Sequence, residues 1–93
     1  MVNALRIHAA DNVAVALHDL AAGVPLSFAD HAVDAAICTR EPIPFGHKVA
    51  LVFIPVGDQV IKYGAPIGLT TTDIAPGQHV HVHNLQSVRG SAQ

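Results

Sequence analysis

The sequence predicts a small all-β domain made of short strands and tight turns, with little helix. Six prolines and seven glycines interrupt the 93-residue chain too often for long helices. Between these interruptions, four segments alternate aliphatic residues with other residues, as half-buried strands do. A short motif with a central glycine also recurs, which indicates that one kind of turn joins several of the strands.

The expected elements follow the chain in order. The strands are predicted at 12–17 (NVAVAL), 48–53 (KVALVF), 59–63 (QVIKY) and 78–84 (QHVHVHN). Residues 27–37 could carry helical turns, with Ser27 or Asp30 as the N-cap, or could form an irregular loop that leads to a strand. We expect the folded domain to span 1–85. Residues 86–93 are predicted to be a polar tail that frays unless a partner holds it.

The recurring motif consists of an aliphatic residue, two variable positions, a glycine, two variable positions and a second aliphatic residue. Its copies are Leu20-Gly23-Leu26, Ile43-Gly46-Val49, Ile54-Gly57-Val60 and Ile74-Gly77-Val80. Each copy indicates an apolar anchor, a turn whose glycine adopts a conformation closed to bulky residues, and the start of the next strand. The glycines are unevenly spaced, so we expect a recurring corner rather than a solenoid of fixed period.

Composition and charge exclude several classes of function. The chain is 51% hydrophobic and 13% charged, enough for one small core but not for two domains. Its five Lys and Arg residues are scattered and outnumbered by seven Asp and Glu, and it has no Trp. Nucleic-acid binders usually cluster basic side chains and add stacking aromatics, so nucleic acid is not an expected partner.

No membrane or export signal is expected either. The longest apolar run, 49–56, contains a proline and is far shorter than the roughly 20 residues of a spanning helix. Residues 1–12 lack the pattern of a signal peptide. The single cysteine, Cys38, fits a reducing compartment and is expected to be a small buried residue. We therefore expect a soluble cytoplasmic protein.

Seven histidines are the most distinctive feature of the sequence. His79, His81 and His83 alternate with Val80 and Val82, so a strand here would place the three imidazoles on one face. Two imidazoles at i and i+2 lie roughly 6.6 Å apart along a strand and can converge on one metal ion. A row of half-exposed histidines, or a contact surface that responds to pH, would give the same pattern.

Two further polar clusters lie next to predicted turns. In Gly46-His47-Lys48, a group that transfers protons stands beside a cation that could hold a carboxylate. In Lys62-Tyr63, a cation and a phenol at a strand end could orient an anionic substrate. Solvated turns would have the same composition. Because so small a chain has little room for a ligand pocket, we expect another polypeptide to complete any active site.

The motifs resemble a known family along nearly the whole chain. They are DNVAVAL at 11–17, DLxxG at 19–23, IPxGHKVAL at 43–51, VIKYGxPIG at 60–68 and DIxPGxxVHxHNL at 73–85. In this order they resemble the SAF-type domain of the altronate and galactarate dehydratase family. The resemblance implies a β-clip fold of short strands and twisted hairpins, shared with the antifreeze-like domain of sialic acid synthases. The resemblance is looser over 28–40, and Phe53 replaces an expected polar residue.

The resemblance also implies a function. Members of the family eliminate water from sugar acids to give 2-keto-3-deoxy acids, with a divalent metal that is commonly Fe2+. In this family the domain is either a separate small subunit or the N-terminal part of a larger chain, and we expect this chain to be the small subunit. The implied partners are a large dehydratase subunit and a sugar-acid substrate, and the isolated chain is expected to be inactive and could form a homo-oligomer.

The implied site residues can be named position by position. Catalytic roles fall on His81, His83, His47 and Lys48, substrate binding on Lys62, Tyr63 and Asn84, and metal binding on His81 and His83. His79 is assigned to the surface, because the family is not expected to have a histidine there. Two alternatives stay open: a non-catalytic module that binds a carbohydrate or a partner, and the small subunit of a sulfolactate sulfo-lyase.

Overall fold

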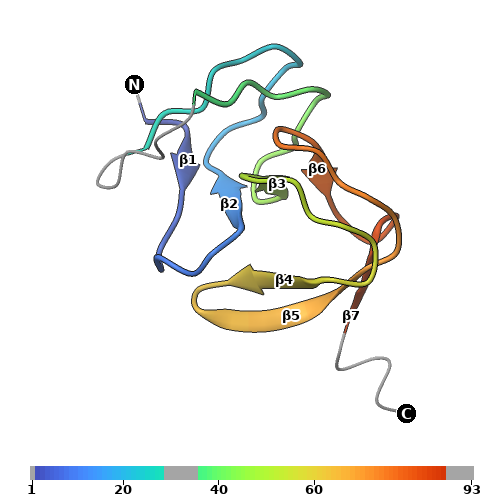
Figure 1. Ribbon diagram of the computed structural model, residues 1–93. Helices are drawn as coiled ribbons and strands as arrows, with labels where there is room; N and C mark the ends of the chain where they lie inside the picture. The colour runs from blue at the N-terminus through green and yellow to red at the C-terminus, as the bar shows by residue number, and fades with distance from the viewer. Residues whose placement is uncertain (1, 29–35, 88–93) are drawn as a thin grey trace.

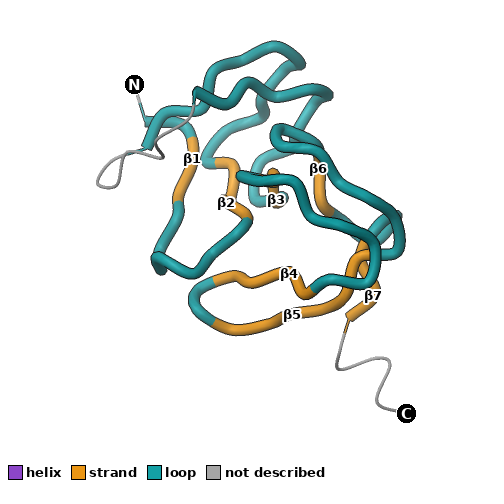
Figure 2. The backbone as a smooth tube through the Cα atoms, viewed as in Figure 1, coloured by secondary structure: helices purple, strands orange, loops and turns teal. Residues whose placement is uncertain are grey.

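The computed structural model describes residues 2–28 and 36–87, and within these residues it contains strands and turns but no helix. The strands are β1 (Ala4–Leu5), β2 (Val13–Ala16), β3 (Lys48–Ala50), β4 (Gln59–Lys62), β5 (Ala65–Thr70), β6 (His79–Val80) and β7 (Leu85–Ser87). The prediction of a small all-β domain is confirmed. Loops and turns make up most of the path between these short strands (Figure 2).

The strands form two antiparallel sheets. One has the order β1-β2-β3-β6 and the other the order β4-β5-β7. In Figure 1 the β4–β5 hairpin crosses below the first sheet, with β7 beside it. β3 is central to the first sheet, because Lys48 pairs with Val15 of β2 on one side and with Val80 of β6 on the other. This pairing brings two segments distant in sequence, 47–50 and 78–81, side by side.

The recurring corner predicted from the glycine motif is present in both halves of the chain. The first anchors of the four copies pair in two isolated bridges, Leu20 with Ile43 and Ile54 with Ile74. The amide of Gly46 donates to the Ala16 carbonyl.

The same bonds then recur in the second half of the chain. The Gly77 amide donates to the Ala50 carbonyl, as the Gly46 amide does to Ala16. Likewise, the Gly23 amide donates to Thr39 and the Gly57 amide to Thr70. The two halves of the domain therefore repeat one hydrogen-bonding scheme.

The aliphatic residues of the motif also form the core. Leu20, Ile43 and Val49, from the first half, lie in one buried cluster with Leu51 and several alanines. The motif residues of the second half lie in another, together with Val13 and Ala50: they are Ile54, Val60, Ile74 and Val80. Each half of the repeat thus supplies one apolar cluster, and the sheet formed by β2 and β3 contributes to both.

The strands predicted at 12–17, 48–53 and 59–63 are confirmed over 13–16, 48–50 and 59–62, as β2, β3 and β4. Residues 51–53 lie outside β3. The strand predicted at 78–84 is wrong after Val80, because the chain bends at His81 and turns back through Asn84. Val82, expected on the buried face, is therefore 81% exposed. Cys38 was expected to be buried and is exposed.

Three strands, β1, β5 and β7, were not predicted from the sequence. β5 contains Pro66 and Gly68, which normally argue against a strand. Pro66 pairs with Ile61, directly after a register shift between Val60 and Ile61 that interrupts the ladder. A Cβ at Gly68 would overlap the Gln86 carbonyl, so the absence of a side chain lets β7 approach.

β7 includes Gln86 and Ser87, which we assigned to the tail, and residues 88–93 lie outside the described residues. Most of the stretch with predicted helical turns, residues 29–35, lies outside them as well. The domain boundary at residue 85 stays a prediction.

β4 and β5 are joined by a two-residue turn at Tyr63 and Gly64. Both residues have positive φ angles, 55° and 79°, as a type I′ hairpin requires. Asp11 holds this turn against the β1–β2 connection: its carboxylate accepts hydrogen bonds from the Gly64 amide at 2.8 Å and from the His8 amide at 3.1 Å. Burial alone would raise the pKa of Asp11, but these backbone hydrogen bonds outweigh it and lower the pKa below the usual 3.8.

Replacing Asp11 by asparagine should therefore destabilise the domain in a pH-dependent way. At pH 7 we expect the free energy of unfolding to fall by about 1–2 kcal/mol, because the amide accepts fewer backbone hydrogen bonds than the carboxylate. The folded-state pKa is depressed, so the stabilisation by Asp11 is present above the unfolded pKa and is lost as the pH falls through the folded pKa. Urea unfolding from pH 7 to pH 3 should show the two proteins converging on the acidic side. A constant difference would contradict this role.

Candidate functional site

Four imidazoles gather where β3 and β6 pair. His47 immediately precedes β3, His79 begins β6, and His81 and His83 lie in the turn that follows β6. Lys48 pairs with Val80 and Val49 with His79, so the same register carried one residue further places His47 opposite His81. Residues 79 and 81 share a face through the alternation of β6, and His47 joins them through the pairing. Sheet register, rather than proximity in sequence, assembles this group.

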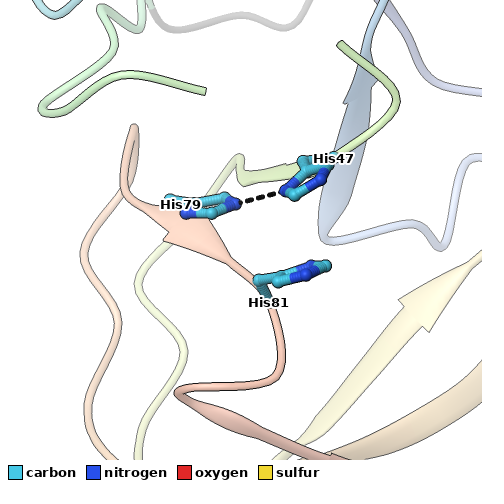
Figure 3. Close-up of side chains that lie close together, drawn as sticks. All are labelled: His47, His79 and His81. Carbon is cyan, nitrogen blue, oxygen red and sulfur yellow. Dashed lines mark hydrogen bonds between the residues drawn. The ribbon is translucent and has the colours of Figure 1, made fainter. Parts of the chain in front are cut away.

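His47, His79 and His81 form a compact set, which we call the histidine trio. His47 Nδ1 and His79 Nε2 are 2.8 Å apart, so one of these nitrogens donates a hydrogen bond to the other. Figure 3 shows this bond, with the ring of His81 below. The rings of His47 and His81 stack at a centroid distance of 4.1 Å and an interplanar angle of 18°. His83 stands beside the trio, its ring 5.2 Å from that of His79 and tilted by 42°.

The environment of the trio lowers the pKa of His79 and of His81 and so favours their neutral forms. Burial lowers the pKa of His79, and charge on His47, His83 and His81 lowers it further, while Glu41 acts in the opposite direction. Burial also lowers the pKa of His81, reinforced by His47, Lys48 and His83. The neutral imidazole can accept a proton or bind a metal. These are the two kinds of chemistry that the trio can perform.

Lysines supply positive charge near the trio. Partial burial lowers the pKa of Lys48, and the positive charge of Lys62 lowers it further. Lys62 belongs to β4, in the other sheet, and its Nζ lies 4.9 Å from the centre of the Tyr63 ring. Two lysines close enough for one to lower the pKa of the other form a favourable place for an anion such as a carboxylate.

Asn84 fixes the turn that carries His81 and His83. Its Oδ1 accepts a hydrogen bond from the His81 amide at 2.9 Å, and its Nδ2 donates to the His79 carbonyl at 2.8 Å. The Asn84 amide also donates to the His81 carbonyl at 3.0 Å. Glu41 holds the start of β6, because its Oε2 accepts a hydrogen bond from the His79 amide at 2.9 Å. Both polar atoms of the buried Asn84 side chain are thus engaged within the chain.

The structure brings some of the predicted site residues together and separates others. His47 and His81 meet in the trio and Lys48 lies next to them. His83 is exposed and outside the trio, since the expected strand ends at Val80. The catalytic, substrate-binding and metal-binding roles assigned to these residues stay predictions.

His79, which we assigned to the surface, lies within the trio and was missed as a functional candidate. Its alternation with His81 on a predicted strand was the available signal. The resemblance to the family led us to discount that signal.

An open hollow of about 350 Å³ lies elsewhere on the domain. It is lined by Ala36, Ile37, Cys38, Arg40, Leu51 and Pro76 and shares no residue with the trio. The hollow is mostly apolar and has one cation, so it offers less chemistry than the histidines do. We therefore take the trio and the adjacent lysines as the candidate site.

The repeated corners and the two antiparallel sheets define a small all-β domain of the β-clip type, with a cluster of histidines where β3 and β6 pair. The chain belongs to the family described as the altronate/galactarate dehydratase SAF domain, which matches residues 2–88. The family resemblance drawn from the sequence motifs is confirmed.

Named relatives agree with this assignment. The altronate dehydratase of Escherichia coli (strain K12) is 49% identical over 83 residues, which cover 89% of this chain and 16% of that protein. The (2R)-sulfolactate sulfo-lyase subunit alpha of Paracoccus pantotrophus is 45% identical over 56 residues, which cover 60% of this chain and 84% of that subunit. The galactarate dehydratase (L-threo-forming) of Escherichia coli (strain K12) is 34% identical over 76 residues.

The aligned part of the chain thus spans about a sixth of the altronate dehydratase but most of the sulfo-lyase subunit. Among the described residues, no helix has the length and apolar character needed to cross a membrane.

Proposed function

We propose that this chain is the SAF part of a lyase that eliminates water from a sugar acid of the altronate or galactarate type. The product would be a 2-keto-3-deoxy acid, and a large dehydratase subunit or domain would complete the site. Membership of the family supports the reaction class. The observation that carries the proposal is a trio of imidazoles, with the pKa values of His79 and His81 lowered, on a domain that aligns with only 16% of the altronate dehydratase.

The reaction needs a base and an acid on neighbouring carbons. The base removes the proton next to the carboxylate, and the hydroxyl on the adjacent carbon leaves as water after it receives a proton. The resulting enol then becomes the 2-keto-3-deoxy acid. We propose that the imidazoles of His47, His81 and His83 transfer these protons, with Lys48 beside them. One unprotonated imidazole accepts the proton from the carbon, and one protonated imidazole gives a proton to the leaving hydroxyl.

The remaining predicted roles concern binding. Lys62 and Tyr63 would contact the anionic substrate from the β4–β5 hairpin, with Lys62 facing its carboxylate. Asn84 would support the same site through the turn that it holds. A divalent metal, Fe2+ by resemblance to the family, would act as a Lewis acid at the departing oxygen. Of the two ligands predicted for it from the sequence, His81 belongs to the trio and His83 does not.

A reconstituted enzyme tests the proposal. The chain should be inactive alone and should form a 2-keto acid from altronate or galactarate when combined with its large dehydratase part. In that complex, replacing His81 by alanine should lower kcat/KM by about a hundredfold or more, the lower end of the usual range for loss of a proton-transfer group. His18→Ala is the matched control, because His18 is an exposed histidine outside the cluster.

The outcomes separate the alternatives. Loss of turnover with the complex intact supports the catalytic role. If His81→Ala abolishes assembly alone, or leaves turnover unchanged, the chain is instead a non-catalytic β-clip module. Turnover of a sugar acid by the isolated chain would contradict the division of the site between two polypeptides.

One observation supports the sulfo-lyase alternative. Over the aligned residues, the Paracoccus sulfo-lyase subunit alpha is 45% identical to this chain, nearly as much as the 49% of the Escherichia coli altronate dehydratase. If this relationship defines the substrate, the complex should release sulfite from sulfolactate and leave sugar acids unchanged. A parallel assay with both substrates distinguishes the two reactions.

A further inference from the structure

The histidine trio has the composition of a mononuclear metal site. His47, His79 and His81 each offer a nitrogen atom, and these atoms all lie within 4.8 Å of one another. We propose that the trio binds one divalent transition-metal ion of the class that prefers imidazole, such as Zn2+, Co2+ or Fe2+. This ligand set differs from the predicted pair, His81 and His83. Its catalytic meaning depends on the proposed function, whereas metal binding itself does not.

The distances need only small adjustments. Metal–nitrogen bonds of about 2.0–2.1 Å place two tetrahedral ligands about 3.4 Å apart. His47 Nδ1 and His79 Nε2 are 2.8 Å apart and directed at each other, so they would separate slightly when an ion replaces the proton between them. Both residues are anchored by the pairing of β3 with β6, which keeps them adjacent with or without the ion.

The third ring must turn. An imidazole binds a metal in its ring plane, and His47 and His81 now lie in nearly parallel planes, 18° apart. Both rings therefore cannot point to one ion until one of them rotates. His81 is the ring that can do so, since it lies at a bend and is only partly buried. The torsion that turns an imidazole on its Cβ is broad, so this rotation requires little energy.

The charges around the trio are of both signs: Lys48 places a positive charge near His81, and Glu41 places a negative charge near His79. The carboxylate of Glu41 accepts a hydrogen bond from the His79 amide and brings a negative charge close to the ligands. Three protein ligands leave at least one coordination position open, which is the arrangement of catalytic rather than structural metal sites. That position could be filled by a substrate oxygen or by a group from the partner polypeptide.

The test is titration of the tag-free, chelator-treated chain with Co2+, followed by visible absorption and by isothermal calorimetry with Zn2+. We expect one ion per chain and absorption bands typical of a four- or five-coordinate Co2+ ion. His47→Asn and His79→Gln should each weaken binding at least tenfold. His83→Ala is the matched control from the same turn, and His18→Ala is the control from elsewhere; each should change the affinity less than twofold.

Several results would overturn the inference. The inference is wrong if the ion still binds after His47→Asn and after His79→Gln, if His83→Ala abolishes binding, or if one ion binds per two chains. Circular dichroism of each variant checks that it is folded, and the two trio variants give independent readings if one is not. Metal binding without turnover in the complex would reject the proposed function alone, and turnover without metal binding by the chain would reject this inference alone.

Discussion

Gly77→Ala is expected to lower the free energy of unfolding by about 3 kcal/mol or more, enough to unfold much of a small domain near 37 °C. Two effects combine. The φ angle of Gly77 is +88°, a conformation that side chains with a Cβ rarely adopt, and a Cβ there would overlap the Cys38 carbonyl. The backbone cannot move aside freely, because the Gly77 amide donates to Ala50 and its carbonyl accepts from Arg40.

Gly57→Ala provides the matched control. Gly57 occupies the same place in another copy of the motif and has a φ angle of +84°, but no atom lies within 4 Å of a Cβ built there. The alanine should therefore show only the conformational strain, about 1 kcal/mol. Urea unfolding of both variants measures the difference. Equal losses would mean that the contact with Cys38 is unimportant and that the positive φ angle alone explains the requirement for glycine.

These two glycines also explain why the corners could be predicted from sequence. A turn that needs a positive φ angle selects glycine, and the anchor that precedes it selects an aliphatic residue, so both requirements leave a local pattern. Ile54 and Ile74 are examples: each begins a copy of the motif, and the structure buries them and pairs them. The pattern does not tell which copies pair, because that depends on contacts between distant parts of the chain.

Sequence rules failed where tertiary contacts override local preference. Tyr63 adopts a positive φ angle that is unusual for tyrosine, and Asp11, distant in sequence, holds the adjacent Gly64 amide. Pro66 is tolerated in β5 because the ladder is already interrupted there. In both cases the local preference of the residue disfavours the observed conformation, and contacts with another part of the chain stabilise it.

For the same reason, the sequence predicted some residues of the site but not which of them come together. The histidines at 79, 81 and 83 stood out by alternation, but the choice among them depends on where the strand ends. Asn84 ends it by bonding back to His79 and His81, and the pairing of β3 with β6 then selects His47 as their neighbour. Neither the turn nor the register is visible in a single sequence.

Asn84→Ala should also destabilise the domain strongly, with a loss of about 2–3 kcal/mol in the free energy of unfolding. It removes the acceptor for the His81 amide and the donor to the His79 carbonyl, and a buried polar group left without its partner costs about 1–3 kcal/mol. Gln86→Ala, at an exposed amide in β7, should change stability by less than about 0.5 kcal/mol.

The effect of Asn84→Ala should also be local to the turn. Hydrogen exchange of the His81 amide should accelerate more than that of the Val49 amide in β3, because the turn opens before the sheet does. If stability falls but the two amides accelerate equally, Asn84 supports the domain as a whole. If neither quantity changes, the bend after Val80 is held by the remaining backbone hydrogen bonds, and the trio does not depend on Asn84.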